Sequence, residues 1–222
     1  MFIAENIYMR KLLPLLLIIS SASCASIKHD TALVTDKTIP FDESVIIEEA
    51  VPSKKPDLPL YIMGRGVVNE DKLALFLLKN NPLLDSAYAN ALARIYVDEA
   101  LFEGVNHDIA FVQMCLETGY LRYGGDVKPE QFNFAGLGAT GGGEPGLSFA
   151  EPRVGVRAQI QHLKAYGSEE PLKGELVNPR FRFVRRGASP TYEGLAGTWA
   201  ADRQYAVKLN SLLERLYDFA FD

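Results

Sequence analysis

The chain has 222 residues, of which 48% are hydrophobic and 23% are charged, and its formal net charge is -5. These values are typical of a globular protein with one domain and an appendage, and they argue against the basic surface that a nucleic-acid-binding protein needs. Two cysteines, Cys24 and Cys115, are too few for a disulfide scaffold. Cys115 lies in an apolar segment and is predicted to be a small buried hydrophobic residue.

The N-terminus has the pattern of a targeting segment. The stretch "MRKLLPLLLIISSASC" has a basic start, an apolar core and small residues before Cys24. Residues 1–24 are therefore predicted to be a signal peptide, since the apolar run is too short to span a bilayer. The end "SASC" resembles a bacterial lipobox, although Ser21 stands where leucine is preferred. We expect lipidation of Cys24 and an envelope protein anchored to a membrane, facing the periplasm or the exterior; ordinary secretion is the alternative.

The middle of the chain changes from a tether to helices. Residues 25–65 mix charged residues, threonine and proline without a helical period and are predicted to be a tether, whereas 66–222 form the folded domain. Helical periodicity and capping residues then predict three helices. They cover 69–82 with Asn69 as the cap, 83–105 ending at Gly104, and 106–119 with Asn106 or Asp108 as the cap.

The second half of the domain begins with an irregular segment. Residues 120–149 are rich in glycine and carry no helical stripe, which predicts an irregular or short-stranded lobe. A helix is predicted over 153–166, and a short helical turn followed by a long helix over 189–219. The expected fold is mainly α, with a helical domain and a small glycine-rich lobe.

A single carboxylate stands out at the end of the third helix. That helix is apolar on every side, and Glu117 comes just before Thr118 and Gly119. Burial and the negative end of the helix dipole both disfavour the charged form, so they favour the protonated carboxyl that a general acid needs. The alternative is a glutamate that reaches water or pairs with Arg122.

Four stretches in the right order carry a family resemblance: "AFVQMCLETGYLRYGG", "NFAGLGATGG", "FAEPRVGVRAQIQHLKAY" and "GLAGTWAADRQYAVKL". Together they resemble the bacterial endo-β-N-acetylglucosaminidases of glycoside hydrolase family 73, over about residues 66–218. The resemblance implies cleavage of the β-1,4 bond after N-acetylglucosamine in peptidoglycan glycan strands, without a cofactor. It also implies an α+β lysozyme-like fold, in which the helical domain and the glycine-rich lobe form a substrate groove, and it implies that Glu117 is the general acid.

The resemblance also indicates which residues line the groove. An Asn-aromatic-small-Gly-Leu stretch falls on residues 133–137, where glycine lets a sugar approach the backbone. Asn133 suits an acetamido group, or else it only forms a turn. Trp199 matches the family's aromatic segment, but a lone tryptophan also suits a core. The expected substrate-binding residues are Gln113, Tyr120, Asn133, Phe134, Gly136, Gln159, His162, Trp199 and Tyr205.

The second carboxylate is less well defined. Glycoside hydrolysis usually takes two acids, and the candidates here are Glu144 in "GGGEPG" and Glu151. Glu144 is preferred, and attack by the substrate's own acetamido group is a third route. With three histidines and no HExxH motif, no metal site is predicted, and His162 is either a groove-edge residue or a satisfied helix histidine. The alternatives for function are a muramidase or lytic transglycosylase, or a wall-binding lipoprotein without activity. A monomer is expected.

Overall fold

The computed structural model describes residues 55–222; the leader, Cys24 and most of the predicted tether lie outside them. The mainly helical class is confirmed, because strand pairing in the described residues is limited to isolated bridges. No helix between residues 55 and 222 has the length and apolar character needed to cross a bilayer. The helices are α1 (Glu70–Asn80), α2 (Ser86–Glu103), α3 (His107–Thr118), α4 (Pro152–Gly167) and α5 (Tyr205–Phe221), with 3-10 helices η1 (Pro129–Gln131), η2 (Phe181–Phe183) and η3 (Tyr192–Leu195).

The helix ends follow from local sequence. Asn69 Oδ1 accepts a hydrogen bond from Lys72 N at 2.9 Å and caps α1. Asn106, rather than Asp108, caps α3 through its side-chain oxygen. Gly104 and Gly119 end α2 and α3 in left-handed conformations, with φ of 79° and 58°. Left-handed φ values are unfavourable for residues with a side chain, whereas glycine adopts them at almost no energetic cost. Both helices therefore end where the sequence predicts.

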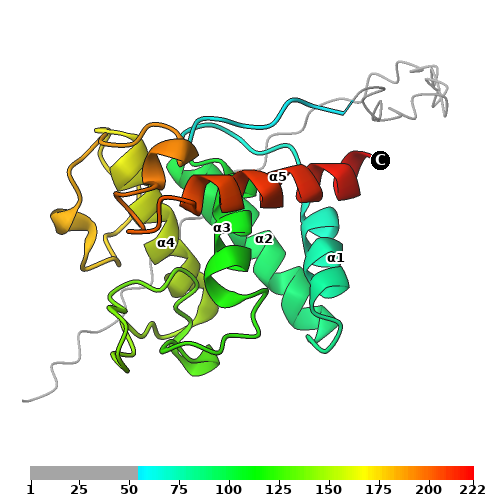
Figure 1. Cartoon of the computed structure of the whole chain (residues 1–222), viewed down its shortest axis with the longest axis horizontal. Coiled ribbons are helices and arrows are strands. Elements are labelled where there is room, and N and C mark those ends of the chain that lie inside the picture. The colour runs from blue at the N-terminus through cyan, green and yellow to red at the C-terminus, as the bar shows by residue number, and fades with distance from the viewer. Residues whose placement is uncertain (1–54) are drawn as a thin grey trace, which may run out of the picture. The chain divides into compact units, whose positions relative to one another are not determined.

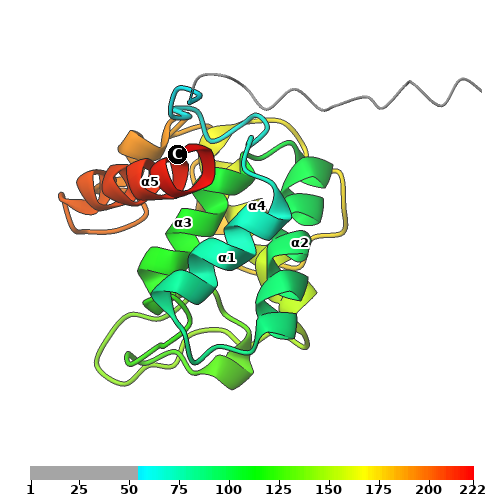
Figure 2. The ribbon, with the colours of Figure 1, turned by 90° about the vertical axis from the view of Figure 1, so that its right-hand side faces the viewer.

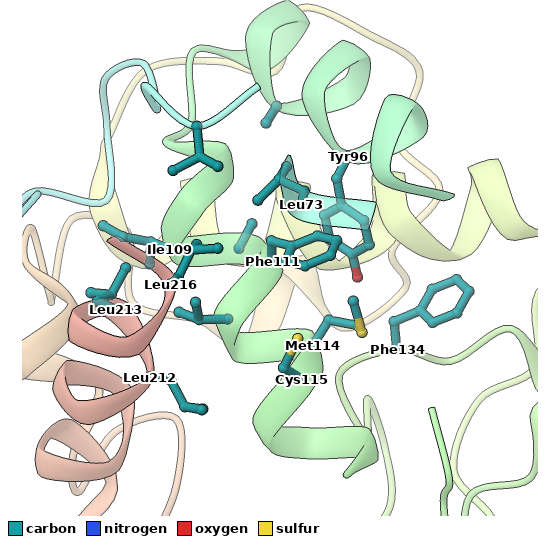
Figure 3. Packing of buried hydrophobic residues seen from close by; sticks show 14 of the residues in the cluster. Leu73, Tyr96, Ile109, Phe111, Met114, Cys115, Phe134, Leu212, Leu213 and Leu216 are labelled. Atoms are coloured by element: carbon teal, nitrogen blue, oxygen red, sulfur yellow. The ribbon is translucent and has the colours of Figure 1, made fainter. Parts of the chain in front are cut away.

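The central helix is α3, which packs against α2, α4 and α5 (Figure 1). Figure 2 shows the helices from a second direction, with α1 nearest the viewer, where it packs against α2 and α5. Phe111 and Met114 of α3 point into the core, where they meet Tyr96 of α2 and Phe134 of the glycine-rich segment (Figure 3). Cys115 is also buried there, and burial raises the pKa of its thiol. The apolar character of α3 therefore reflects a position at the centre of the domain.

The N-terminal strap, residues 58–68, is part of this domain. Ile62 is fully buried, its N donates to Pro190 O at 2.9 Å, and its O accepts from Asn106 N at 2.8 Å. The buried Asp108 carboxylate accepts hydrogen bonds from Val67 N and Val68 N. The packed domain therefore begins N-terminally of residue 66, its expected first residue.

A buried ion pair fastens the segment that follows α4. Lys164 Nζ donates to Glu103 Oε2 at 2.9 Å and to Glu103 O at 3.0 Å, and both residues are at most 1% exposed. Glu103 also accepts from Lys173 N and Gly174 N, each at 3.0 Å. Burial raises the pKa of Glu103, but these hydrogen bonds outweigh it and the pKa is lowered. The carboxylate thus joins α2, α4 and the 173–174 backbone.

Candidate active site

Glu117 lies in the last turn of α3, and two aromatic residues hold its carboxyl group. Trp199 Nε1 donates to Glu117 Oε1 at 3.1 Å, and Tyr205 Oη donates to the same oxygen at 2.5 Å. Oε2 faces Gly136, where an added Cβ would lie 3.8 Å from it. One carboxyl oxygen is therefore occupied by protein donors, and the other points toward glycine backbone.

The surroundings of Glu117 favour the neutral carboxyl. The residue is accessible to solvent, yet it sits on a concave surface where protein atoms surround the carboxyl group on most sides. Burial raises the pKa of Glu117 by more than the hydrogen bonds from Tyr205 and Trp199 lower it. An acid with a raised pKa stays protonated closer to neutral pH than a free glutamate does.

A groove runs past Glu117. We define it as two adjoining hollows, of about 340 and 280 Å³, which share Glu117, Gly136 and Ala139. The first continues toward α5 and the segment before it, and the second continues into the glycine-rich segment. The first hollow is also lined by Trp199, Tyr205 and Lys208, and the second by Tyr123, Asp126 and Asn133.

A chain of buried hydrogen bonds supports the carboxyl from behind. Tyr96 Oη donates to Gln159 Oε1 at 2.6 Å, and Gln159 Nε2 donates to Gln113 Oε1 at 2.9 Å. Gln113 Nε2 then donates to Tyr205 Oη at 3.1 Å, which directs the single Tyr205 proton toward Glu117. Gln113 and Gln159 are both 0% exposed, so the prediction that they contact substrate is wrong. They orient Tyr205 instead.

Other predicted groove residues turn out to be structural. Phe134 is 1% exposed and packs edge-on against Tyr96, so it belongs to the core. Asn133 lies beside the groove, but its amide accepts from Leu137 N and donates to the carbonyl oxygens of Leu137 and Leu147. Its side chain therefore builds the turn, which was the alternative interpretation.

Tyr120 lies on the side of α3 that faces α1 and α5. Its ring packs against Phe76, and its hydroxyl accepts a hydrogen bond from Arg215. Tyr120 is not among the residues that line the two hollows, whereas Tyr123 is. Both tyrosines have left-handed backbone, with φ of 59° and 56°. Tyr120 therefore lies outside the groove, contrary to the prediction, and Tyr123 is the tyrosine in its wall.

His162 and Tyr166 form an aromatic layer with Trp199. The His162 ring centroid is 5.0 Å from that of Trp199 and 5.5 Å from that of Tyr166. Burial and the nearby Arg180 charge lower the pKa of His162 to about 4. Asn178 Nδ2 lies 2.7 Å from His162 Nδ1. His162 is thus a neutral, hydrogen-bonded residue behind Trp199.

The remaining acids lie in different places. Glu144 is exposed at a tight turn, where it bridges to Gly141, and it does not line either hollow of the groove. Asp126 does line the second hollow, although it was not among the predicted site residues. Its position between Glu117 and Asn133, in a glycine-rich segment, is the sequence feature that could have indicated a place in the groove. Within residues 55–222, no group of three or more His, Cys, Asp or Glu residues could hold a metal ion.

Comparison with known proteins identifies the family. The sequence model of the glucosaminidase family, described as mannosyl-glycoprotein endo-beta-N-acetylglucosaminidase, matches residues 85–218. This chain belongs to the glucosaminidase family. The glucosaminidase is therefore a glycoside hydrolase, and the matched residues include Glu117, the groove and the buried hydrogen-bond chain.

Two individual proteins resemble this glucosaminidase. A protein of Borreliella burgdorferi, described as an uncharacterized protein, is 43% identical over 174 residues, which cover 78% of this chain and 85% of the relative. Among solved structures, S. aureus autolysin E in complex with the muropeptide NAM-L-Ala-D-iGlu has a TM-score of 0.47 and 14% identity, and the similarity covers 74% of each chain.

Proposed function

We propose that this glucosaminidase hydrolyses peptidoglycan at the β-1,4 bond after N-acetylglucosamine, with Glu117 as the general acid. The observation that carries the proposal is the asymmetry of the Glu117 carboxyl: Oε1 accepts from Trp199 and Tyr205, while Oε2 faces Gly136 in the groove. A protonated carboxyl with its donors on Oε1 carries its proton on Oε2. That proton is then directed at a glycosidic oxygen bound in the groove.

Product masses test the bond that is cleaved. Digestion of purified peptidoglycan should release fragments that end in reducing N-acetylglucosamine. Fragments that end in reducing N-acetylmuramic acid would identify a muramidase, and anhydromuramic ends would identify a lytic transglycosylase. Binding to the wall without any new ends would leave only the non-catalytic alternative. Each of the last three outcomes contradicts the proposal.

Removal of the Tyr205 hydroxyl should shift the pH profile. The hydrogen bond from Tyr205 stabilises the Glu117 carboxylate and so lowers its pKa. In Tyr205→Phe the pKa should rise further, and the basic limb of kcat, where the acid loses its proton, should move to higher pH. The control is Tyr192→Phe, which removes a hydroxyl that donates to Asn210 at 2.7 Å. If the basic limb moves equally in both variants, or does not move, the Tyr205 hydroxyl does not influence the pKa of Glu117.

The second carboxylate is open to a direct comparison. Asp126 shares a hollow with Glu117, whereas Glu144 is exposed at a turn and Glu151 is exposed at the start of α4. We expect Asp126→Asn to lower kcat by about 10²-fold, the contribution of a catalytic base, and Glu144→Gln to lower it by much less. The reverse order would restore Glu144 as the base or nucleophile. Small effects of both, with Glu151→Gln also active, would indicate attack by the substrate's acetamido group.

The N-terminus supports a proposal about location. The enzyme would lie at the cell envelope as a monomer. A lipid on Cys24 would hold it there, and residues 25 to about 57 would form the tether between the lipid and the catalytic domain. Cys24→Ala should shift the protein from the membrane fraction to the soluble or secreted fraction, because each buried CH₂ of an acyl chain contributes roughly 0.8 kcal/mol. Fractionation followed by immunoblotting checks this, with Cys115→Ala as the control. Unchanged partitioning would contradict the anchor.

A further inference from the structure

A short segment after α4 concentrates positive charge on an acidic protein. Between residues 178 and 190 there are four arginines and no acidic residue, while the whole chain has a net charge of -5. We call residues 180–186 the arginine loop. Phe183 is 66% exposed at its centre, with the guanidinium of Arg182 at 4.8 Å and that of Arg180 at 5.7 Å from the ring. The loop thus presents a flat apolar face between two cations.

The arginines of the loop differ in how they are used. Arg186 is structural, because its guanidinium donates to the backbone oxygens of Ser168 and Glu170 and covers the Phe181 ring. Arg180 and Arg182 are exposed and form no ion pair with a carboxylate among residues 55–222. Their charges are therefore available to an anionic ligand.

The arginine loop lies close to the wall of the groove without lining either hollow. An added Cβ at Gly138 would lie 3.7 Å from Arg180 Cδ, and the charge of Arg180 contributes to the lowered pKa of His162. The His162 ring contacts Trp199, which in turn donates to Glu117. Arg180 therefore stands one aromatic layer away from the groove wall, on the side of the first hollow.

We propose that Arg180 and Arg182 bind carboxylate groups on the peptide stems of peptidoglycan, an inference that rests on the proposed function. In that polymer every second sugar carries a peptide with free carboxylates, and a stem that leaves the groove beside Trp199 meets Arg180 first. Guanidinium groups match carboxylates through paired hydrogen bonds, and the Phe183 ring suits the methyl groups of short side chains. The loop then makes the enzyme prefer glycan that carries peptides.

The experiment uses two forms of one substrate. Soluble glycan–peptide fragments are compared with the same fragments after their carboxylates have been capped as amides. For the wild-type protein we expect kcat/KM to be about five- to tenfold higher on the uncapped form, the range of two partly exposed ion pairs. In Arg180→Gln/Arg182→Gln this preference should disappear, and the rate on capped fragments should not change. The control, Lys72→Gln/Arg94→Gln, removes two exposed charges from α1 and α2 and should keep the preference.

Outcomes that overturn the inference differ from failure of the proposed function. If the wild-type protein shows no preference for uncapped fragments, or if the double variant keeps that preference, the arginines do not bind the carboxylates. An equal loss on both substrates assigns the loop a general role in the fold or in sugar binding. Arginine-dependent binding to anionic phosphatidylglycerol vesicles, without discrimination between fragments, assigns it to lipid. If neither fragment is cleaved, the proposed function fails, and the affinity of Glu117→Gln for the two fragments still tests the loop by itself.

Discussion

Replacing Glu117 by glutamine should lower the rate of glycan cleavage by about 10²-fold or more, because a general acid supplies a factor of this size. The amide has nearly the same shape, and its oxygen can accept the hydrogen bonds from Trp199 and Tyr205. The fold should therefore persist. Initial rates on purified peptidoglycan, together with circular dichroism, separate loss of chemistry from loss of structure.

The same variant has a stability signature. Burial raises the pKa of folded Glu117 above its unfolded value, so the wild-type protein loses stability as pH rises through that interval. Glu117→Gln does not titrate and should melt at an equal or higher temperature than wild type above this interval. Glu193→Gln, a change at an exposed residue of η3, is the control. A folded Glu117→Gln protein that cleaves at nearly the wild-type rate would make the glutamate structural.

Removing Glu103 should have the largest effect on stability. Glu103→Ala leaves the fully buried Lys164 ammonium with only the Glu103 carbonyl oxygen, and the N–H groups of Lys173 and Gly174 lose their acceptor. Breaking a buried pair on one side costs about 3–5 kcal/mol. The free energy of unfolding from urea titration measures the loss.

A second variant distinguishes the buried charge from the lost packing. Glu103→Leu/Lys164→Met removes both ions and should unfold less easily than Glu103→Ala, since no charge is left without a partner. If Glu103→Ala costs less than about 1 kcal/mol, water must reach Lys164 and the ion pair does not hold the 173–174 backbone. Equal losses in the single and double variants would trace the effect to packing.

Local sequence was sufficient for predicting the helices and for selecting Glu117 as the candidate acid. Periodicity placed α1 to α5, and Asn69, Asn106 and Gly119 set helix ends because their side chains or backbone act on neighbours within a few residues. Glu117 could be selected because its unfavourable features, an apolar helix and a helix C-terminus, are themselves local. Helical periodicity did not determine which apolar residues are buried: Leu101 of α2 is 52% exposed.

The supporting parts of the site depend on contacts between distant segments. Gln113 meets Tyr205 across 92 positions, and no local pattern separates such a buried glutamine from one that lines a groove. The left-handed backbone of Tyr123 could not be predicted from the sequence either, because glycine and asparagine are the residues that usually adopt this conformation. Asp126 could be identified only from the three-dimensional groove, since single acidic residues are common in loops.

The burial of Cys115 allows thiol labelling to report on local opening of α3, the helix that carries Glu117. It is the one cysteine after residue 24, it is 1% exposed, and only Leu116 separates it from Glu117 in the sequence. A thiol reagent can reach it only when the packing between α3 and α5 opens locally, since the folded state withholds both access and a reactive thiolate. When opening and closing are faster than modification, the labelling rate in dilute buffer therefore gives the free energy of opening around Glu117 without any denaturant.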